Sequence, residues 1–119
     1  KGWVMEEAAH NTIKENICSL LQDDRVEDVN AILAETDDCS LADANLRSAN
    51  LQGLHVDGLD FSNAYLRSAN IKGLDMRTCS LEGASLHGAQ IAGTYFPAEL
   101  SPEEILLSVT NGTRLRYRR

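Results

Sequence analysis

The sequence lacks the long apolar segments that membrane insertion or export requires. No apolar run approaches the roughly 18 to 20 residues of a transmembrane helix, and no basic region followed by an apolar signal segment opens the chain. We therefore expect a soluble protein without a membrane span. The chain begins with Lys1 rather than Met, so we expect a processed product or an excised part of a longer protein.

Proline and cysteine are also scarce. With two prolines, 43 % hydrophobic and 24 % charged residues, the 119-residue chain has the composition of one folded globular domain. Three cysteines are too few for a disulfide scaffold and lack the paired spacing of a zinc site, so we expect small buried thiols. A disulfide between Cys18 and Cys39 is an alternative, because helices at the N-terminus could fold over the segment that begins at Cys39 and bring the two thiols together.

Motifs that carry catalysis are absent from the sequence. There is no nucleophile motif, no glycine loop that would cradle a phosphate and no metal-ligand spacing. We predict that the chain is not an enzyme and has neither a cofactor nor a metal site.

The acidic charge is concentrated near the N-terminus. Residues 1–38 hold ten acids and three bases (−7), residues 39–98 five and four (−1), and residues 99–119 three and four (+1), which together give the net charge of −7. The middle of the chain is therefore nearly neutral.

What the sequence does contain is a five-residue repeat. From Cys39 the chain divides without insertion into twelve units: CSLAD, ANLRS, ANLQG, LHVDG, LDFSN, AYLRS, ANIKG, LDMRT, CSLEG, ASLHG, AQIAG and TYFPA. The third residue of every unit is apolar, which random placement would produce with a chance on the order of 10⁻⁵ to 10⁻⁴. A period of five fits neither a helix nor a continuous strand, so each unit should be a short extended piece followed by a turn.

The positions within a unit have distinct roles. The first and third residues, such as Ala49 and Leu51, should point inward together, because alternate side chains of an extended segment share a side. The fifth residue should lie in a turn of type II with positive φ, which favours Gly or Asn, as at Gly53 and Asn63.

The pattern A(D/N)LxG over residues 39–98 resembles the pentapeptide-repeat family. This resemblance implies a mainly β solenoid, a right-handed quadrilateral β-helix (the Rfr fold) in which four units form one coil and twelve units form about three. It also explains why the nearly identical segments NLRSANLQGL and YLRSANIKGL begin twenty residues apart, at Asn45 and Tyr65. Such coils stack at about 4.8 Å, the usual distance between paired strands.

Both ends of such a stack need a cover, because they expose unpaired backbone groups. We expect residues 1–38 to form an N-terminal helical cap of two helices, with a turn at Asp23-Asp24 and with Asp24 and Glu27 as a capping pair. The apolar residues of this cap fall on one face of each helix: Ile13, Ile17, Leu20 and Leu21, then Val26, Val29, Ile32 and Leu33.

Residues 99–119 should form a capping helix followed by a basic tail. The helix should begin at Ser101-Pro102, stop at Asn111-Gly112, and lie over the last coil. Its inward side chains should be Ile105, Leu106 and Val109. The tail carries four arginines, and because these lack a folded context we expect a solvated or domain-connecting end rather than a nucleic-acid site.

Outward residues twenty positions apart should stack in columns on the surface. One column is basic, a neighbouring column carries amides, with Lys72 beside it, and another side is acidic around Arg77. The basic column contains Arg47, Arg67 and His87, the amide column contains Asn50, Asn70 and Gln90, and the acidic side contains Asp57, Asp60, Asp75 and Glu82. The basic column, Asn50, Asn70 and Lys72 are our candidate binding residues for an acidic partner or anion, although repeated residues can also be a by-product of duplication.

We expect a non-catalytic module for protein–protein interaction that acts as a monomer. The family resemblance implies the same, since many members are binding modules, and they abound in cyanobacteria and chloroplasts. The compartment stays open between the cytoplasm and, if a targeting peptide was removed, the periplasm or thylakoid lumen. Two alternatives remain: an inhibitor of DNA gyrase that mimics DNA, which the near-neutral repeats do not favour, and an accessory domain of a larger effector or enzyme.

Overall fold

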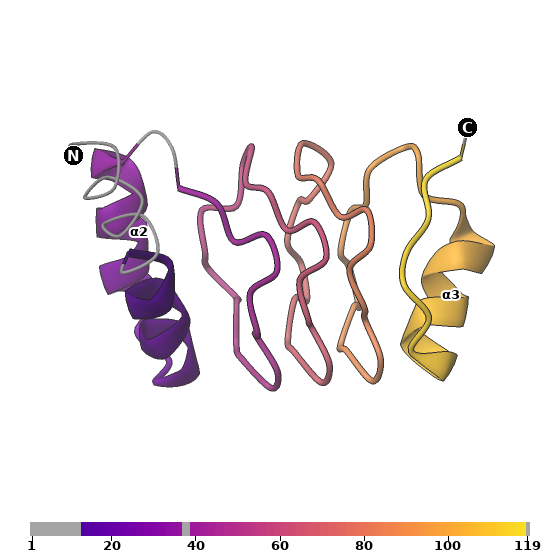
Figure 1. Ribbon diagram of the computed structural model, residues 1–119, viewed down its shortest axis with the longest axis horizontal. Helices are drawn as coiled ribbons and strands as arrows, with labels where there is room; N and C mark the ends of the chain where they lie inside the picture. The colour runs from indigo at the N-terminus through magenta and orange to yellow at the C-terminus, as the bar shows by residue number, and fades with distance from the viewer. Residues whose placement is uncertain (1–12, 37–38, 119) are drawn as a thin grey trace, which may run out of the picture.

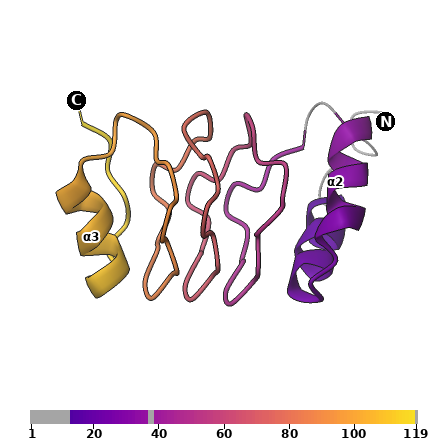
Figure 2. The ribbon, with the colours of Figure 1, turned by 180° about the vertical axis from the view of Figure 1, so that it is seen from behind.

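The computed structural model describes residues 13–36 and 39–118, in which two helical ends enclose a stack of chain layers (Figure 1). Residues 13–22 are helical, followed by α2 (Val26–Glu35), and both lie at one end of the stack. Helix α3 (Pro102–Asn111) lies at the other end, as the view from behind also shows (Figure 2). Residues 1–12 and 37–38 of the predicted N-terminal cap lie outside the described residues.

The layers are joined by pairs of residues twenty positions apart. All six parallel bridges have this spacing, and one column, Asn50 to Asn70 to Gln90, runs through successive layers. In the described part of the chain the pairing consists of such isolated bridges rather than continuous strands, because every five-residue unit turns a corner soon after each bridge. The spatial repeat of twenty residues confirms the period seen in the sequence.

The core is made of the first and third residues of the units. Ten third-position side chains are buried: Leu41, Leu46, Leu51, Val56, Phe61, Leu66, Ile71, Met76, Leu81 and Leu86. Ile91 and Phe96 are partly buried against the same core. Most first-position residues, including Ala49 and Leu54, are buried as well. The predicted inward register is confirmed. Burial of each large apolar side chain in it stabilises the folded state by about 1.5–3 kcal/mol.

The fifth residue of nearly every unit turns the corner. Ten of the twelve fifth positions have positive φ, six of them glycines, while Thr78 and Ala98 do not. In the first unit Asp43 has φ 64° and the N–H of Ala44 donates to the carbonyl of Leu41 at 3.1 Å. In the four-residue turn from Leu41 to Ala44, the last N–H thus bonds to the first carbonyl, and the third residue, Asp43, has positive φ. These are the features of the predicted type II turn.

Helix α3 supplies the hydrogen bonds that a further layer would otherwise provide. Within the stack, third-position N–H groups donate to a carbonyl nineteen residues later, as Leu66 does to Ser85 at 2.9 Å. In the last layer Leu86 donates instead to the hydroxyl of Ser108 (2.9 Å), and Gly88 donates to the carbonyl of Val109 (2.9 Å).

The C-terminal tail corrects our prediction of a solvated end. It lies antiparallel to the last layer, with Arg114 opposite Ser85, and Leu115 exchanges backbone hydrogen bonds of 2.8 Å with Gly83 and Ala84. Leu115 is only 1 % exposed, so burial of its side chain and backbone pairing hold the segment in place.

The signals that bound α3 are confirmed, but one predicted inward residue is wrong. The Ser101 side chain accepts from the N–H of Glu104, and Gly112 ends the helix with φ 78°. Ile105 and Val109 pack on the core, whereas Leu106 is 60 % exposed. The inward face is centred on the fully buried Ser108, and Leu106 lies about 200° around the helix from it.

At the opposite end, polar side chains serve the first layer. Three of them donate to first-layer carbonyls: Lys14 to Ala42 (2.8 Å), Gln22 to Arg47 (3.0 Å) and Asn30 to Gly53 (3.0 Å). Within the stack such a carbonyl accepts from the layer before it, as the carbonyl of Arg67 does from the N–H of Ser48. No repeat layer precedes Arg47, so the Gln22 side chain takes the place of that donor. Ile17, Leu21 and Val29 are fully buried between these helices and the core.

The turn between the two N-terminal helices lies at Asp23-Asp24 as predicted, but the capping pair is wrong. Asp24 has φ 60°, its N–H donates to Leu21, and the N–H of Arg25 donates to Leu20. This bonding closes the C-terminus of the first helix. Because Asp24 ends that helix, α2 begins after Arg25, which makes no side-chain capping bond.

Candidate binding face

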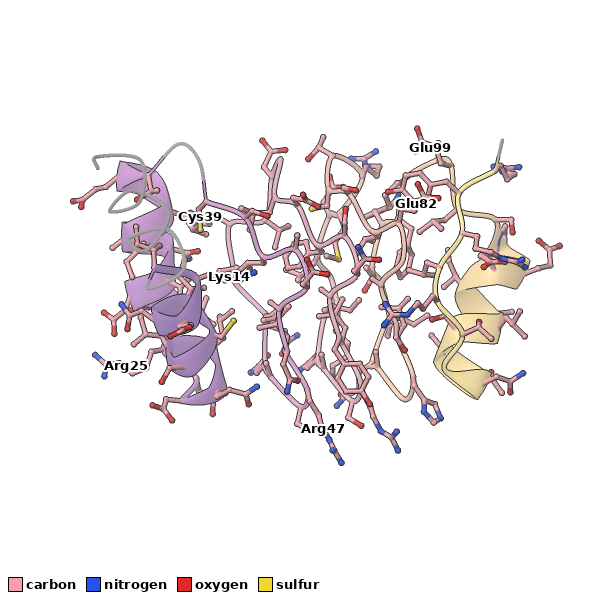
Figure 3. The ribbon with its side chains drawn as sticks, viewed as in Figure 1. Lys14, Arg25, Cys39, Arg47, Glu82 and Glu99 are labelled. Carbon is pink, nitrogen blue, oxygen red and sulfur yellow. The ribbon has the colours of Figure 1, made fainter. Side chains whose placement is uncertain are left out.

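The structure brings the predicted basic residues into one column across three layers. The N–H of Ser48 donates to the carbonyl of Arg67 at 2.8 Å, and that of Ser68 to the carbonyl of His87 at 2.8 Å, so Arg47, Arg67 and His87 follow one another from layer to layer. Arg47 is exposed and projects from the body of the molecule (Figure 3). Arg67 and His87 are half-buried.

No carboxylate within residues 13–36 and 39–118 pairs with this column. The ion pairs in that part of the chain are Arg25–Asp28, Arg77–Asp75 and Arg116–Glu104. Arg47, Arg67 and Lys72 belong to none of them. Nothing among the described residues forms an ion pair with them, which makes them available to an anionic partner.

The neighbouring amide column is partly occupied by local structure. The Oδ1 atoms of Asn50 and Asn70 accept from the backbone N–H two residues later, at 3.1 Å each, which supports the corner that follows. The Asn70 amide also donates to Gln52 at 2.9 Å. The sequence placed these amides correctly on the surface, but their oxygens hold turns, and Gln90 is the exposed member of the column.

His87 is positioned by the end of α3. A Cβ at Gly112 would lie 3.3 Å from the Cβ, Cγ and Nδ1 of His87, and Gly112 itself has φ 78°. Glycine at this point therefore serves both the left-handed backbone and the space for the imidazole ring.

On the acidic side Arg77 is paired within the chain. Arg77 binds Asp75 through two hydrogen bonds of 2.8 and 2.7 Å and lies 5.1 Å from the centre of the Tyr95 ring. The hydrogen bond from the Arg77 side chain, with a further one from its backbone, lowers the pKa of the Asp75 carboxyl to about 2. Asp57 accepts from the hydroxyl of Thr78 at 2.5 Å. The Arg77 charge is therefore satisfied on its own side, unlike the charges of Arg47 and Arg67 among the described residues.

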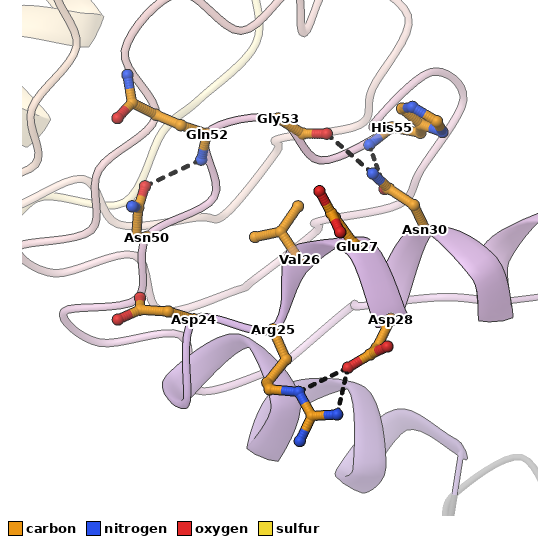
Figure 4. A pocket seen from close by; sticks show the side chains of 10 residues that line it. All are labelled: Asp24, Arg25, Val26, Glu27, Asp28, Asn30, Asn50, Gln52, Gly53 and His55. Carbon is orange, nitrogen blue, oxygen red and sulfur yellow. Dashed lines mark hydrogen bonds and ion pairs between the residues drawn. The ribbon is translucent and has the colours of Figure 1, made fainter.

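An open groove lies where α2 meets the first layer (Figure 4). It encloses about 700 Å³ and is lined by Asp24, Arg25, Val26, Glu27, Asp28, Asn30, Asn50, Gln52, Gly53 and His55. Asn30 stands in its wall, where its amide donates to Gly53 (3.0 Å) and accepts from the N–H of His55 (2.8 Å). A second groove of about 320 Å³ shares Asn30 and His55.

The groove has no arrangement that indicates chemistry. Arg25 and Asp28 neutralise each other at 2.6 Å, and the Asn30 amide is satisfied within the chain. In the part of the chain that the structure describes, no group of three or more His, Cys, Asp or Glu side chains could hold a metal ion. No motif in the sequence indicates these grooves, because they form between segments far apart in the chain.

The cysteines are free thiols. Cys18 and Cys39 are half-buried, and burial raises the pKa of both. Cys79 is buried, its Sγ donates to the carbonyl of Val56 at 3.1 Å, and burial raises its pKa to about 11. The structure thus contains no Cys18–Cys39 disulfide.

Comparison with known proteins gives one match. A family model described as pentapeptide repeats matches residues 39–70 and 60–96, with eight copies. Searches of curated proteins and of solved structures found no match. Among the described residues, no helix combines the length and the hydropathy that a membrane crossing demands.

Proposed function

Because residues 39–96 belong to the pentapeptide-repeat family, we propose that the chain is a monomeric, non-catalytic module that binds a protein partner. Pentapeptide repeats imply a β-helical solenoid. The finer architecture we propose is a right-handed quadrilateral β-helix of about three coils, with helical caps from residues 1–38 and 99–119. The bridges at a spacing of twenty residues and the hydrogen bonds that α3 accepts from the last layer support it.

The observation that carries the proposal is the unpaired basic column. A chain with 18 acids and 11 Lys and Arg residues could neutralise all its cations, and it does pair Arg25, Arg77 and Arg116. Among the described residues it nevertheless pairs no carboxylate with Arg47 or Arg67, which lie in adjacent layers. Like charges stacked at about 5 Å repel mildly, so this arrangement favours an acidic partner over internal stability.

The alternatives receive less support. Mimicry of DNA requires a strongly negative surface, whereas residues 39–98 carry five acids against four bases. An accessory role in a larger effector or enzyme is compatible with a binding module. The basic column would then bind its partner in the same way as part of a longer protein.

The test is affinity capture with matched charge variants. We compare the proteins retained by the wild type, by an Arg47→Glu/Arg67→Glu double variant, and by an Arg25→Glu/Arg118→Glu double variant with the same change in charge. We expect a protein retained by the wild type and the control to be lost from the Arg47/Arg67 variant, with all three showing the same cooperative melt.

The control also tests the α2 groove, because Arg25 lines it. A partner lost only from the Arg25/Arg118 variant would contradict the proposed face and point to the groove or the tail. A partner retained equally by all three proteins would show that neither arginine set contributes.

A further inference from the structure

Arg114 adds a basic residue beyond the repeats, in the column of Asn45, Tyr65 and Ser85 that runs beside the basic column. It is exposed and paired antiparallel to Ser85, which places its backbone one row past the last layer on the side that carries Arg67 and His87. Its guanidinium donates to the carbonyl of Gly83 at 2.8 Å, and no described carboxylate forms an ion pair with it. The basic face, defined as Arg47, Arg67, His87 and Arg114, therefore covers every row from the first layer to the tail.

This fourth row cannot be explained by duplication. Arg47 and Arg67 both occur in LRSAN segments, so one could have been copied from the other without selection. Arg114 lies outside the repeats, in a segment that runs in the opposite direction. Two unrelated segments thus place arginines that no described carboxylate pairs with on one side of the molecule.

The remaining residues of the face are neutral. The second-position residues beside the arginines are Asn45, Tyr65 and Ser85, and Tyr65 is 37 % exposed. The three arginines of the face carry +3 with no acid among them, while Lys72 adds a charge in the adjoining column. An aromatic surface beside unpaired guanidinium groups is typical of a protein-binding surface.

We propose that the basic face binds a short, extended, acidic segment of a partner protein, and that the tail residue Arg114 is part of the site. This inference rests on the proposed function and specifies its ligand. Four rows at about 4.8 Å span roughly 14 Å, which four or five extended residues would cover. Guanidinium groups bind carboxylates through two parallel hydrogen bonds, so Asp or Glu side chains suit them.

A protein ligand suits the charge distribution better than a polynucleotide does. Residues 13–36, at the end next to Arg47, contain six acids and two bases, which would repel a long polyanion that extended past the face. A short acidic segment contacts only the face and avoids this repulsion.

The experiment measures fluorescence anisotropy with fluorescein-labelled octaglutamate, and with a labelled eight-nucleotide oligothymidylate as the competing class. The proteins are the wild type, Arg47→Gln/Arg67→Gln, Arg114→Gln, Arg114→Lys and the tail control Arg118→Gln, each checked by its melting temperature. We expect the wild type to bind octaglutamate more tightly than the oligonucleotide, with affinity falling as salt rises.

We expect Arg114→Gln to weaken octaglutamate binding by about two- to fivefold, the size of one exposed charge contact, and the double variant to weaken it by about tenfold. Arg118→Gln should bind like the wild type, since it lies off the face. Arg114→Lys should bind more tightly than Arg114→Gln but less tightly than the wild type, because it keeps the charge and loses the two parallel hydrogen bonds.

Three results would overturn the inference and leave the proposed function standing. Octaglutamate binding that depends on Arg47 and Arg67 but is equal in Arg114→Gln and Arg118→Gln would remove the tail from the site. No octaglutamate binding at millimolar concentration, or tighter binding of the oligonucleotide, would exclude an acidic protein segment as the ligand. The proposed function itself fails only if the captured partner is indifferent to Arg47 and Arg67.

Discussion

The hydroxyl oxygen of Ser108 in α3 lies 2.9 Å from the backbone nitrogen of Leu86 in the last layer and accepts its hydrogen bond. Ser108 also donates to the carbonyl of Thr113 at 2.6 Å and is fully buried. One side chain thus joins the repeats, α3 and the start of the tail.

Replacement of Ser108 by Ala should lower the free energy of unfolding by about 1–3 kcal/mol. It leaves the buried N–H of Leu86 and the partly buried carbonyl of Thr113 without this partner. Denaturant unfolding measures the loss, with Thr110→Ala on the exposed side of α3 as the control. Equal stabilities of the two variants would show that water replaces the hydroxyl without cost.

Leu66 tests the inward register of the repeats, since it is fully buried at the centre of the stack. Leu66→Ala should cost about 2–5 kcal/mol through lost contacts and a cavity. Leu66→Asp should abolish cooperative melting, because an unpaired carboxylate in the core costs several kcal/mol. Gln90→Asp places the same charge at an exposed position and should melt like the wild type; a normal melt of Leu66→Asp would contradict the register.

Gly83 faces the side chain of the residue one layer before it. It has φ 82°, and a Cβ there would collide with the amide oxygen of Asn63. Gly83→Ala should therefore destabilise the protein more than Gly58→Ala, which has φ 75° but open space around it. Both variants strain a backbone of similar positive φ, so the difference between their unfolding free energies measures the effect of the collision alone.

The double variant Gly83→Ala/Asn63→Gly completes this test. Glycine tolerates the φ of 59° at position 63 and removes the obstructing amide, so the extra loss at Gly83 should disappear. If the two changes were simply additive, the proposed collision between adjacent layers would be wrong.

Asp75 should titrate far below an ordinary aspartate. Its pKa is lowered to about 2 from 3.8 by the Arg77 hydrogen bonds, so the ion pair is intact above pH 3.8 and is lost as the pH falls towards 2. Carbon-detected NMR of the carboxyl group should give a midpoint near 2 in the wild type. In Arg77→Gln the midpoint should rise towards 3.8, and identical midpoints in both proteins would show that Arg77 does not bind Asp75 in solution.

Local patterns in the sequence predicted much of this fold. The apolar third positions predicted the core from Leu41 to Leu86, and the residue types at the fifth positions predicted the corners, because both depend on one unit and its repetition. Ser101 and Gly112 likewise predicted the bounds of α3 from short-range capping chemistry.

The ends of the stack were harder to predict, because their contacts are non-local and occur once. No periodicity indicates that Arg114 would pair with Ser85, or that Asn30 would donate to Gly53. The error at Leu106 has the same origin. Hydrophobicity favoured Leu106 for the inward face, but the unpaired N–H of Leu86 requires a hydroxyl, and Ser108 supplies it.

The candidate face was predicted in position but not in full extent. The period of twenty residues placed Arg47, Arg67 and His87 in one column, since bridged residues share a side of the stack. Arg114 has no place in that period, and the role of the Asn50 and Asn70 oxygens in turns became visible only with the hydrogen bonds. The contribution of all these residues to binding remains a prediction.

The most direct test is to map the ligand on the surface without choosing a residue in advance. Two-dimensional ¹H–¹⁵N NMR spectra of the labelled protein are recorded during titration with unlabelled octaglutamate. We predict that the largest shift changes cluster at Asn45, Arg47, Tyr65, Arg67 and Arg114, with α2 and the Asp75–Arg77 side unaffected. Shift changes centred on the α2 groove, or spread evenly over the molecule, would contradict the account.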